Sequence, residues 1–241
     1  MSESKGVLTE YEPALSVPRK AKLDGILLGY MARRLQLTLA QLERSGGLRR
    51  SLPLVYHVQE RRGQAHRIAL YHPEVLLTQA PLAFVGFLSA RQKLLYPSIL
   101  NAIKRTDKRL VMELTAAPGI LSYSSLEMRN GDWCNLVVLT DASAKSHITG
   151  SQTHQYAAYS LSHTYYAWIR LHSGVLPVGL DHMEMHVLKT RYYTFHSGQA
   201  KPSIQELAYP WPSEVEGERM AVVAENSAAD ASLPHREYLE V

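Results

Sequence analysis

The order of the apolar segments in residues 82–195 constrains the fold of this chain more than any other feature. A short apolar run at 82–88 has the length of a buried strand, and the pattern after it has helical spacing over 97–117. Two further strand-like runs flank Asn130 and Gly131, a pair that favours a tight hairpin turn. These segments predict the order strand, helix, strand, strand.

Two more segments complete this order. Residues 144–177 contain four histidines and are interpreted as a second helical region, which Gly174 and Pro177 close. Residues 183–195 are predicted to form the last strand. The order β-α-β-β-α-β is that of a ferredoxin-like unit, an α+β arrangement in which both helices cover one face of an antiparallel sheet. The other face stays bare, and we expect a second copy of the chain to cover it as a homodimer.

The segments on either side predict an N-terminal extension and a C-terminal tail. Residues 1–80 contain an extended arm, an amphipathic helix that Asp24 can cap and Gly46 can end, and two β-prone runs joined by a polar hairpin. Residues 197–241 carry eight acidic and three basic side chains, a balance of −5, which leaves +9 on the rest. We therefore expect an extension at 1–80, the ferredoxin-like domain at 81–196 and an acidic tail at 197–241.

Composition narrows the class of protein. A hydrophobic content of 46% with 20% charged residues is typical of soluble globular proteins. The single cysteine, Cys134, excludes an internal disulfide and a multi-cysteine metal site. The chain has no apolar run of roughly 20 residues, no apolar segment near Met1 and no nucleic-acid recognition motif, so we expect a cytoplasmic protein without a membrane or nucleic-acid partner.

A loose motif carries a resemblance to a known superfamily. Residues 118–120 (Pro-Gly-Ile) precede a strand and a hairpin, the apolar run 134–139 follows, and His147, Ser151 and His154 come after it. This succession resembles the dimeric α+β barrel superfamily, which includes the antibiotic-biosynthesis-type monooxygenases and the heme-degrading oxygenases. The resemblance covers about half of the chain. It implies a dimeric barrel with a pocket between sheet and helices.

The resemblance also implies a cofactor. In heme-binding members a helix histidine near this position holds the iron, so His154 is the expected heme ligand and His163 the alternative. Arg170 could pair with a heme propionate or a substrate carboxylate, and Trp168 could line the pocket. The first expected function is therefore a heme-binding enzyme that carries out oxidative chemistry on a small organic molecule.

Candidate catalytic residues are His147, Tyr166 and Arg170. His147 lies seven residues before His154, so the two imidazoles share one face of a continuous helix. A second possible function keeps the fold without a cofactor: a monooxygenase that positions an oxidisable aromatic substrate, with a histidine as the base.

An alternative to heme is a metal site formed by His182, Glu184 and His186. Residues two apart on a strand share a face, so these side chains could form a set of two histidines and one carboxylate. A third, non-enzymatic possibility is a partner-binding protein whose acidic tail, anchored by Trp211, docks on the basic body of its own chain or of a neighbouring subunit.

Overall fold

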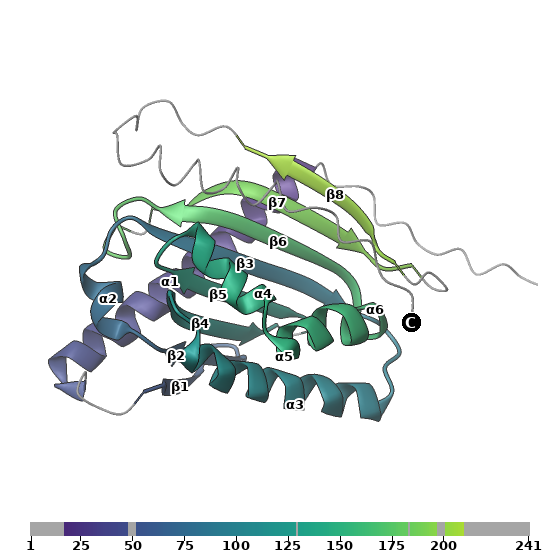
Figure 1. Ribbon diagram of the computed structural model, residues 1–241, viewed down its shortest axis with the longest axis horizontal. Helices are drawn as coiled ribbons and strands as arrows, with labels where there is room; N and C mark the ends of the chain where they lie inside the picture. Colours follow the sequence, from purple (N-terminus) through teal and green to yellow (C-terminus); the bar gives the residue numbers. More distant parts are fainter. Residues whose placement is uncertain (1–16, 48–51, 129, 183, 197–200, 210–241) are drawn as a thin grey trace, which may run out of the picture.

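The computed structural model describes residues 17–47, 52–128, 130–182, 184–196 and 201–209. This part of the chain is an α+β fold in which eight strands form one antiparallel sheet (Figure 1), with the order β1-β2-β4-β5-β3-β6-β7-β8. The strands are β1 (Leu54–Gln59), β2 (Ala65–Leu70), β3 (Leu82–Arg91), β4 (Ile120–Glu127), β5 (Trp133–Leu139), β6 (Tyr166–Leu176), β7 (His186–Thr194) and β8 (Ser203–Ala208). The helices are α1 (Val17–Arg44), α2 (Pro73–Thr78), α3 (Pro97–Glu113), α4 (Lys145–Thr149), α5 (Gln152–Gln155) and α6 (Ser162–Tyr165), with 3-10 turns η2 (Leu114–Ala116) and η3 (Ala142–Ala144) and a π-helix η4 (Tyr156–Leu161).

The predicted succession of strand, helix and hairpin is confirmed in β3, α3, β4 and β5. Pro97 is the first residue of α3, where its fixed φ suits the helix and its missing N–H costs nothing. Gly131 has a φ of +78° in the hairpin turn and donates its N–H to the carbonyl of Met128 at 2.9 Å. Gly63 has a φ of +80° in the turn between β1 and β2, so the polar hairpin of the N-terminal extension is also confirmed.

The interpretation of residues 144–177 as one helical region is wrong for its second half. Helix α6 ends at Tyr165, and β6 pairs with β3 from Leu176 back to Tyr166. Strand pairing along the whole of β3 outweighs the helical spacing of the aromatic residues. Gly174 does not end a helix. It lies in the strand, where an added Cβ would come within 2.6 Å of the Phe84 ring.

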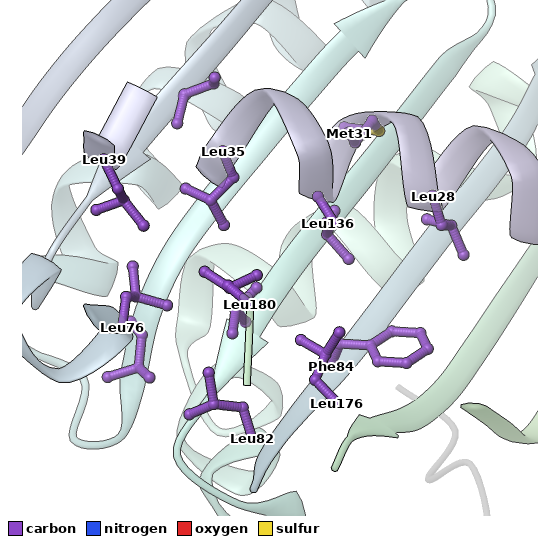
Figure 2. Packing of buried hydrophobic residues seen from close by; sticks show 14 of the residues in the cluster. Leu28, Met31, Leu35, Leu39, Leu76, Leu82, Phe84, Leu136, Leu176 and Leu180 are labelled. Atoms are coloured by element: carbon purple, nitrogen blue, oxygen red, sulfur yellow. The ribbon is translucent and has the colours of Figure 1, made fainter. Parts of the chain in front are cut away.

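The sheet face that was expected to be bare is covered by α1. In Figure 1 this helix runs behind the sheet, and α3, α4, α5 and α6 lie in front. Figure 2 shows Leu28, Met31 and Leu35 of α1 over Phe84 and Leu136 of the sheet. Gly86 of β3 permits this close approach, because a Cβ there would lie 2.5 Å from a methyl group of Leu28.

The start of α1 differs from expectation. The helix begins at Val17, so Asp24 lies in its interior rather than at its cap. Its side chain is buried against the sheet. The end of the helix is as predicted: α1 stops at Arg44, and Gly46 follows with a φ of +65°.

A second apolar cluster fills the space between the sheet and the helices in front. Val111 and Leu114 of the α3 region and Ile148 of α4 pack on Val137 and Leu139 of β5. Buried layers on both faces of the sheet therefore give the protein three layers.

The sheet extends beyond the expected central unit in both directions. From the N-terminal extension, β2 pairs with β4, and from the tail, β8 pairs with β7. The described part of the chain thus forms one long sheet rather than the four-stranded sheet of the expected unit. Trp211, the expected anchor of the tail, lies outside the described residues. No helix in the described ranges combines the length and apolar character that a membrane crossing requires.

Candidate functional site

On the face covered by α3, two phenols and an ion pair form a polar cluster. Arg67 of β2 donates from Nη1 and Nη2 to the two carboxylate oxygens of Asp107 on α3, at 2.6 and 2.8 Å. The Arg67 guanidinium also lies 5.5 Å from the ring centre of Tyr123 on β4. Tyr166 approaches the same region from β6, with its ring centre 5.5 Å from that of Phe87.

Three donors in this cluster lack acceptors within the described part of the chain. Nε of Arg67 is buried without a partner, and neither Tyr123 nor Tyr166 makes a hydrogen bond through its hydroxyl. Burial, together with the negative charge of Asp107, raises the pKa of both phenols well above the ordinary value. Both hydroxyls are therefore protonated at neutral pH and can donate. Because nearly all buried polar groups have partners, Nε of Arg67 marks a place where a water or a ligand oxygen can bind, and the two hydroxyls beside it can donate there as well.

His154, a second predicted residue besides Tyr166, lies in the same layer. It lies on α5, and the π-helix η4 follows directly after it. Its ring is partly exposed, but Nδ1 is buried and has no hydrogen-bond partner in the described ranges. Burial and the nearby charge of Lys145 lower the pKa of the imidazole below its ordinary value. At neutral pH the ring is therefore uncharged and carries a free lone pair.

Helix α3 connects the two parts of this site. Thr153, next to His154, donates its hydroxyl to Glu113 of α3 at 2.6 Å. Asp107, which holds Arg67, lies six residues earlier on the same helix, about 9 Å away along its axis. We call the set His154, Arg67, Asp107, Tyr123 and Tyr166 the helix-side site.

Arg170 and Trp168 are not brought together with His154. The guanidinium of Arg170 lies on the α1 face of the sheet, where Nε and Nη2 donate to Asp24 at 2.6 and 2.7 Å, and it stacks 4.0 Å from the Trp168 ring centre. Tyr166 belongs to the other face, because the register between β3 and β6 shifts beside it, between Ala90 and Arg91.

The other histidines of residues 144–177 have different surroundings. His147 on α4 and His163 on α6 are exposed. His172 is fully buried in β6, with Nδ1 2.8 Å from the Thr190 hydroxyl and Nε2 3.0 Å from Asp24. His172 therefore belongs to the cluster around the Asp24–Arg170 ion pair, which connects β6 to α1.

The proposed set of His182, Glu184 and His186 is formed only in part. Strand β7 begins at His186, so the first two residues precede the strand and do not share its face. Glu184 and His186 are in contact at 2.6 Å, and His182 is exposed. Within the described ranges no three His, Cys, Asp or Glu side chains come together in a way that could hold a metal ion.

Sequence reasoning named Tyr166 but missed the other members of the polar cluster, and it also missed a second ion cluster behind the sheet. Arg67 and Asp107 are 40 residues apart, and only the placement of α3 over β2 brings them together. Behind the sheet, Glu60 accepts from Arg34 of α1 at 2.8 and 3.0 Å, contacts Nδ1 of His66 at 2.8 Å and accepts from the Tyr30 hydroxyl. One signal was available: the helical spacing of Tyr30 and Arg34 on α1 places both on one side of that helix.

The chain was compared with protein-family models, curated proteins and solved structures. None of the three comparisons gave a match.

Proposed function

We propose that the protein is an enzyme that binds a small aromatic molecule at the helix-side site and uses His154 as a general base. The single observation behind this proposal is the unpaired set of polar atoms in that layer: Nδ1 of His154, Nε of Arg67 and the hydroxyls of Tyr123 and Tyr166. The aromatic side chains of Phe87 and Tyr166 supply flat apolar surface beside them.

The chemistry follows from the charge states of these groups. The two parts of the site are about 9 Å apart along α3, so the neutral imidazole takes a proton from an acidic hydroxyl of the substrate through a bound water. The phenols of Tyr123 and Tyr166 donate to the oxygen that becomes negative. Arg67 adds a positive charge nearby, which its ion pair with Asp107 partly neutralises. Loss of the proton makes an electron-rich aromatic molecule easier to oxidise, so O₂ is the co-substrate in this proposal.

The arrangement of the central strands supports a ferredoxin-like core for this enzyme. The segments β3, α3, β4, β5, α6 and β6 follow one another in the chain, and their strands lie in the order β4-β5-β3-β6. A relationship with the dimeric α+β barrel superfamily is part of the proposal. Because α1 covers the sheet face that such dimers would bury, a dimer of this chain would need a different surface.

The test uses 1-naphthol as the probe in metal-free, chelator-treated protein. Monooxygenation of 1-naphthol by O₂ gives 1,4-naphthoquinone and water, so one oxygen atom enters the ring and the other leaves as water. We expect quinone formation that falls about 100-fold in His154→Ala, which is the size of a typical base contribution. His57→Ala removes an exposed histidine of β1 and serves as the matched control. Equal rates of quinone formation for wild type and His154→Ala would show that His154 is not the general base and would contradict this proposal.

Heme binding at the same layer is the second candidate, and the neutral state of His154 favours it. Nδ1 is buried, so Nε2 would hold the iron, and bound heme would supply oxidative chemistry there. The fit is partial, because Nδ1 lacks the acceptor that commonly orients a ligating histidine. Hemin titration should then give a Soret band that shifts in His154→Ala and stays in His163→Ala. A featureless titration would exclude heme and leave the cofactor-free reaction as the proposal.

A further inference from the structure

The surface of α1 that faces away from the sheet is unusually apolar for an exposed helix. Leu23, Ile26 and Leu37 have 54%, 65% and 47% of their surface exposed. Tyr30 lies between them, and the helical spacing of the four side chains places them on one stripe. A helix in contact with the sheet on one side ordinarily turns polar residues outward, so this second apolar stripe calls for a covering partner.

The same surface is positively charged. Lys22 and Arg33 are exposed and lie on the stripe with Ile26 and Leu37. The carboxylate nearest to them in sequence, Asp24, points to the other side of the helix, where Arg170 and His172 hold it. Glu60, which accepts from the Tyr30 hydroxyl, is already paired with Arg34 and His66. We call the residues Lys22, Leu23, Ile26, Tyr30, Arg33 and Leu37 the outer face of α1. Its partner must therefore combine apolar side chains with negative charge.

The chain leaves the sheet beside a strand that is connected to α1. Strand β8 ends at Ala208, and Tyr209 donates its N–H to the carbonyl of Leu188 at 2.8 Å. Strand β7 in turn carries Thr190, which is linked through His172 to Asp24 of α1. The residues after Tyr209 thus start beside a strand that is tied to the helix.

The segment 210–241 has the composition that the outer face of α1 requires. It carries seven carboxylates and two arginines: Glu214, Glu216, Glu218, Glu225, Asp230, Glu237 and Glu240 against Arg219 and Arg236. Apolar residues such as Val215, Met220 and Val222 are interspersed among them. A chain of this length spans up to about 100 Å when extended, and α1 is about 42 Å long, so the segment can reach the whole helix.

A carboxylate already binds β8, the strand before this segment, to its neighbour β7. Glu206 of β8 contacts Lys189 at 3.0 Å and accepts from Arg191, both on β7. Strand β8 is therefore held to β7 by ion pairs as well as by strand pairing.

We propose that residues 210–241 dock on the outer face of α1 of their own chain. Carboxylates of the segment lie against Lys22 and Arg33, and its apolar side chains cover Leu23, Ile26 and Leu37. A second copy of the chain is a poorer partner for this face, because two basic surfaces repel each other.

The experiment is zero-length carbodiimide cross-linking of the full chain, which joins a lysine to a carboxylate only when the two are in contact. Equal amounts of ¹⁴N-labelled and ¹⁵N-labelled protein are mixed first, so that mass spectrometry separates links within one copy from links between copies. We expect Lys22 to be linked to a carboxylate of residues 210–241 within one copy. The double variant Leu23→Ser and Ile26→Ser should lower the yield at least fivefold.

The matched control is the double variant Leu94→Ser and Met112→Ser, which changes exposed apolar residues away from α1 and should leave the yield unchanged. Thermal unfolding of both double variants checks that they fold. The proposal is overturned if Lys22 gives no link, if its links join two copies, or if they lead to residues 1–16 instead. Binding of wild-type protein to phosphatidylserine vesicles that requires Leu23 and Ile26, without the expected link, would assign the face to a lipid surface and also overturn it.

Discussion

Asp24 of α1 and Arg170 of β6 form a two-point ion pair between the helix and the sheet, with N–O distances of 2.6 and 2.7 Å. Burial alone would raise the pKa of the Asp24 carboxyl, but the hydrogen bonds from His172 and Arg170 hold it below its ordinary value. His172 is itself bound to Thr190 of β7. This cluster therefore joins α1 to two neighbouring strands.

Removing the carboxylate should destabilise the protein strongly. Asp24→Ala leaves the half-buried Arg170 and the buried His172 without their partner, and we expect the free energy of unfolding to fall by about 3 kcal/mol. Urea unfolding at neutral pH measures this change. Glu43→Ala, which removes an exposed carboxylate from the same helix, should change the stability by less than about 0.5 kcal/mol. Similar losses in the two variants would mean that the ion pair contributes nothing specific.

The second ion cluster predicts a pH dependence of stability. Burial acts to raise the pKa of Glu60, but hydrogen bonds from Arg34, Tyr30 and His66 outweigh it and lower the pKa to about 2. A folded-state pKa below the unfolded value stabilises the protein at higher pH, and this contribution is lost as the pH falls from about 4.5 toward about 2.

Glu60→Gln should therefore cost about 2 kcal/mol near pH 5, and the difference from wild type should shrink on acidification toward pH 3. Urea unfolding at the two pH values gives the comparison. A difference that grows as the pH falls would contradict the assigned sign.

The close contact between α1 and β3 can be tested by filling Gly86. An added Cβ would lie 2.5 and 2.8 Å from the two methyl groups of Leu28, so Gly86→Ala should lower the free energy of unfolding by about 2 kcal/mol. The double variant with Leu28→Ala should lose less than the sum of the two single losses, because the smaller side chain makes room. Gly25→Ala on α1 meets nothing within 4 Å and should be neutral or stabilising. Additive losses at Gly86 and Leu28 would mean that their contact does not limit the packing.

Local sequence signals predicted what depends on local chemistry. Asn130 and Gly131 specify the β4–β5 turn, Pro97 specifies the start of α3, and Gly46 marks the end of α1, because each acts through its own backbone preferences. The strand β6 was missed because its aromatic residues also fit helical spacing, and only pairing with β3 and β7 decides between the two.

The helix-side site depends on contacts that sequence spacing does not encode. His154 was singled out from the sequence, whereas Arg67 and Asp107 meet only after α3 has packed over β2. The separation of Arg170 from His154 has the same origin: the face on which a strand residue lies follows from register, and the register of β6 shifts beside Tyr166. Asp24 looked like a helix cap because the arm before it showed little periodicity, although the helix begins seven residues earlier.

The most direct test of the helix-side site is calorimetric titration of 1-naphthol into wild-type protein and into the double variant Tyr123→Phe and Tyr166→Phe. These substitutions remove the two unpaired hydroxyls and keep both rings, so the fold should be unaffected. We predict a dissociation constant about tenfold weaker in the double variant, with an unchanged thermal midpoint, since each lost hydrogen bond is worth about 0.7 kcal/mol. Equal dissociation constants for the two proteins, or no binding to either, would contradict the proposed binding of an aromatic molecule at this site.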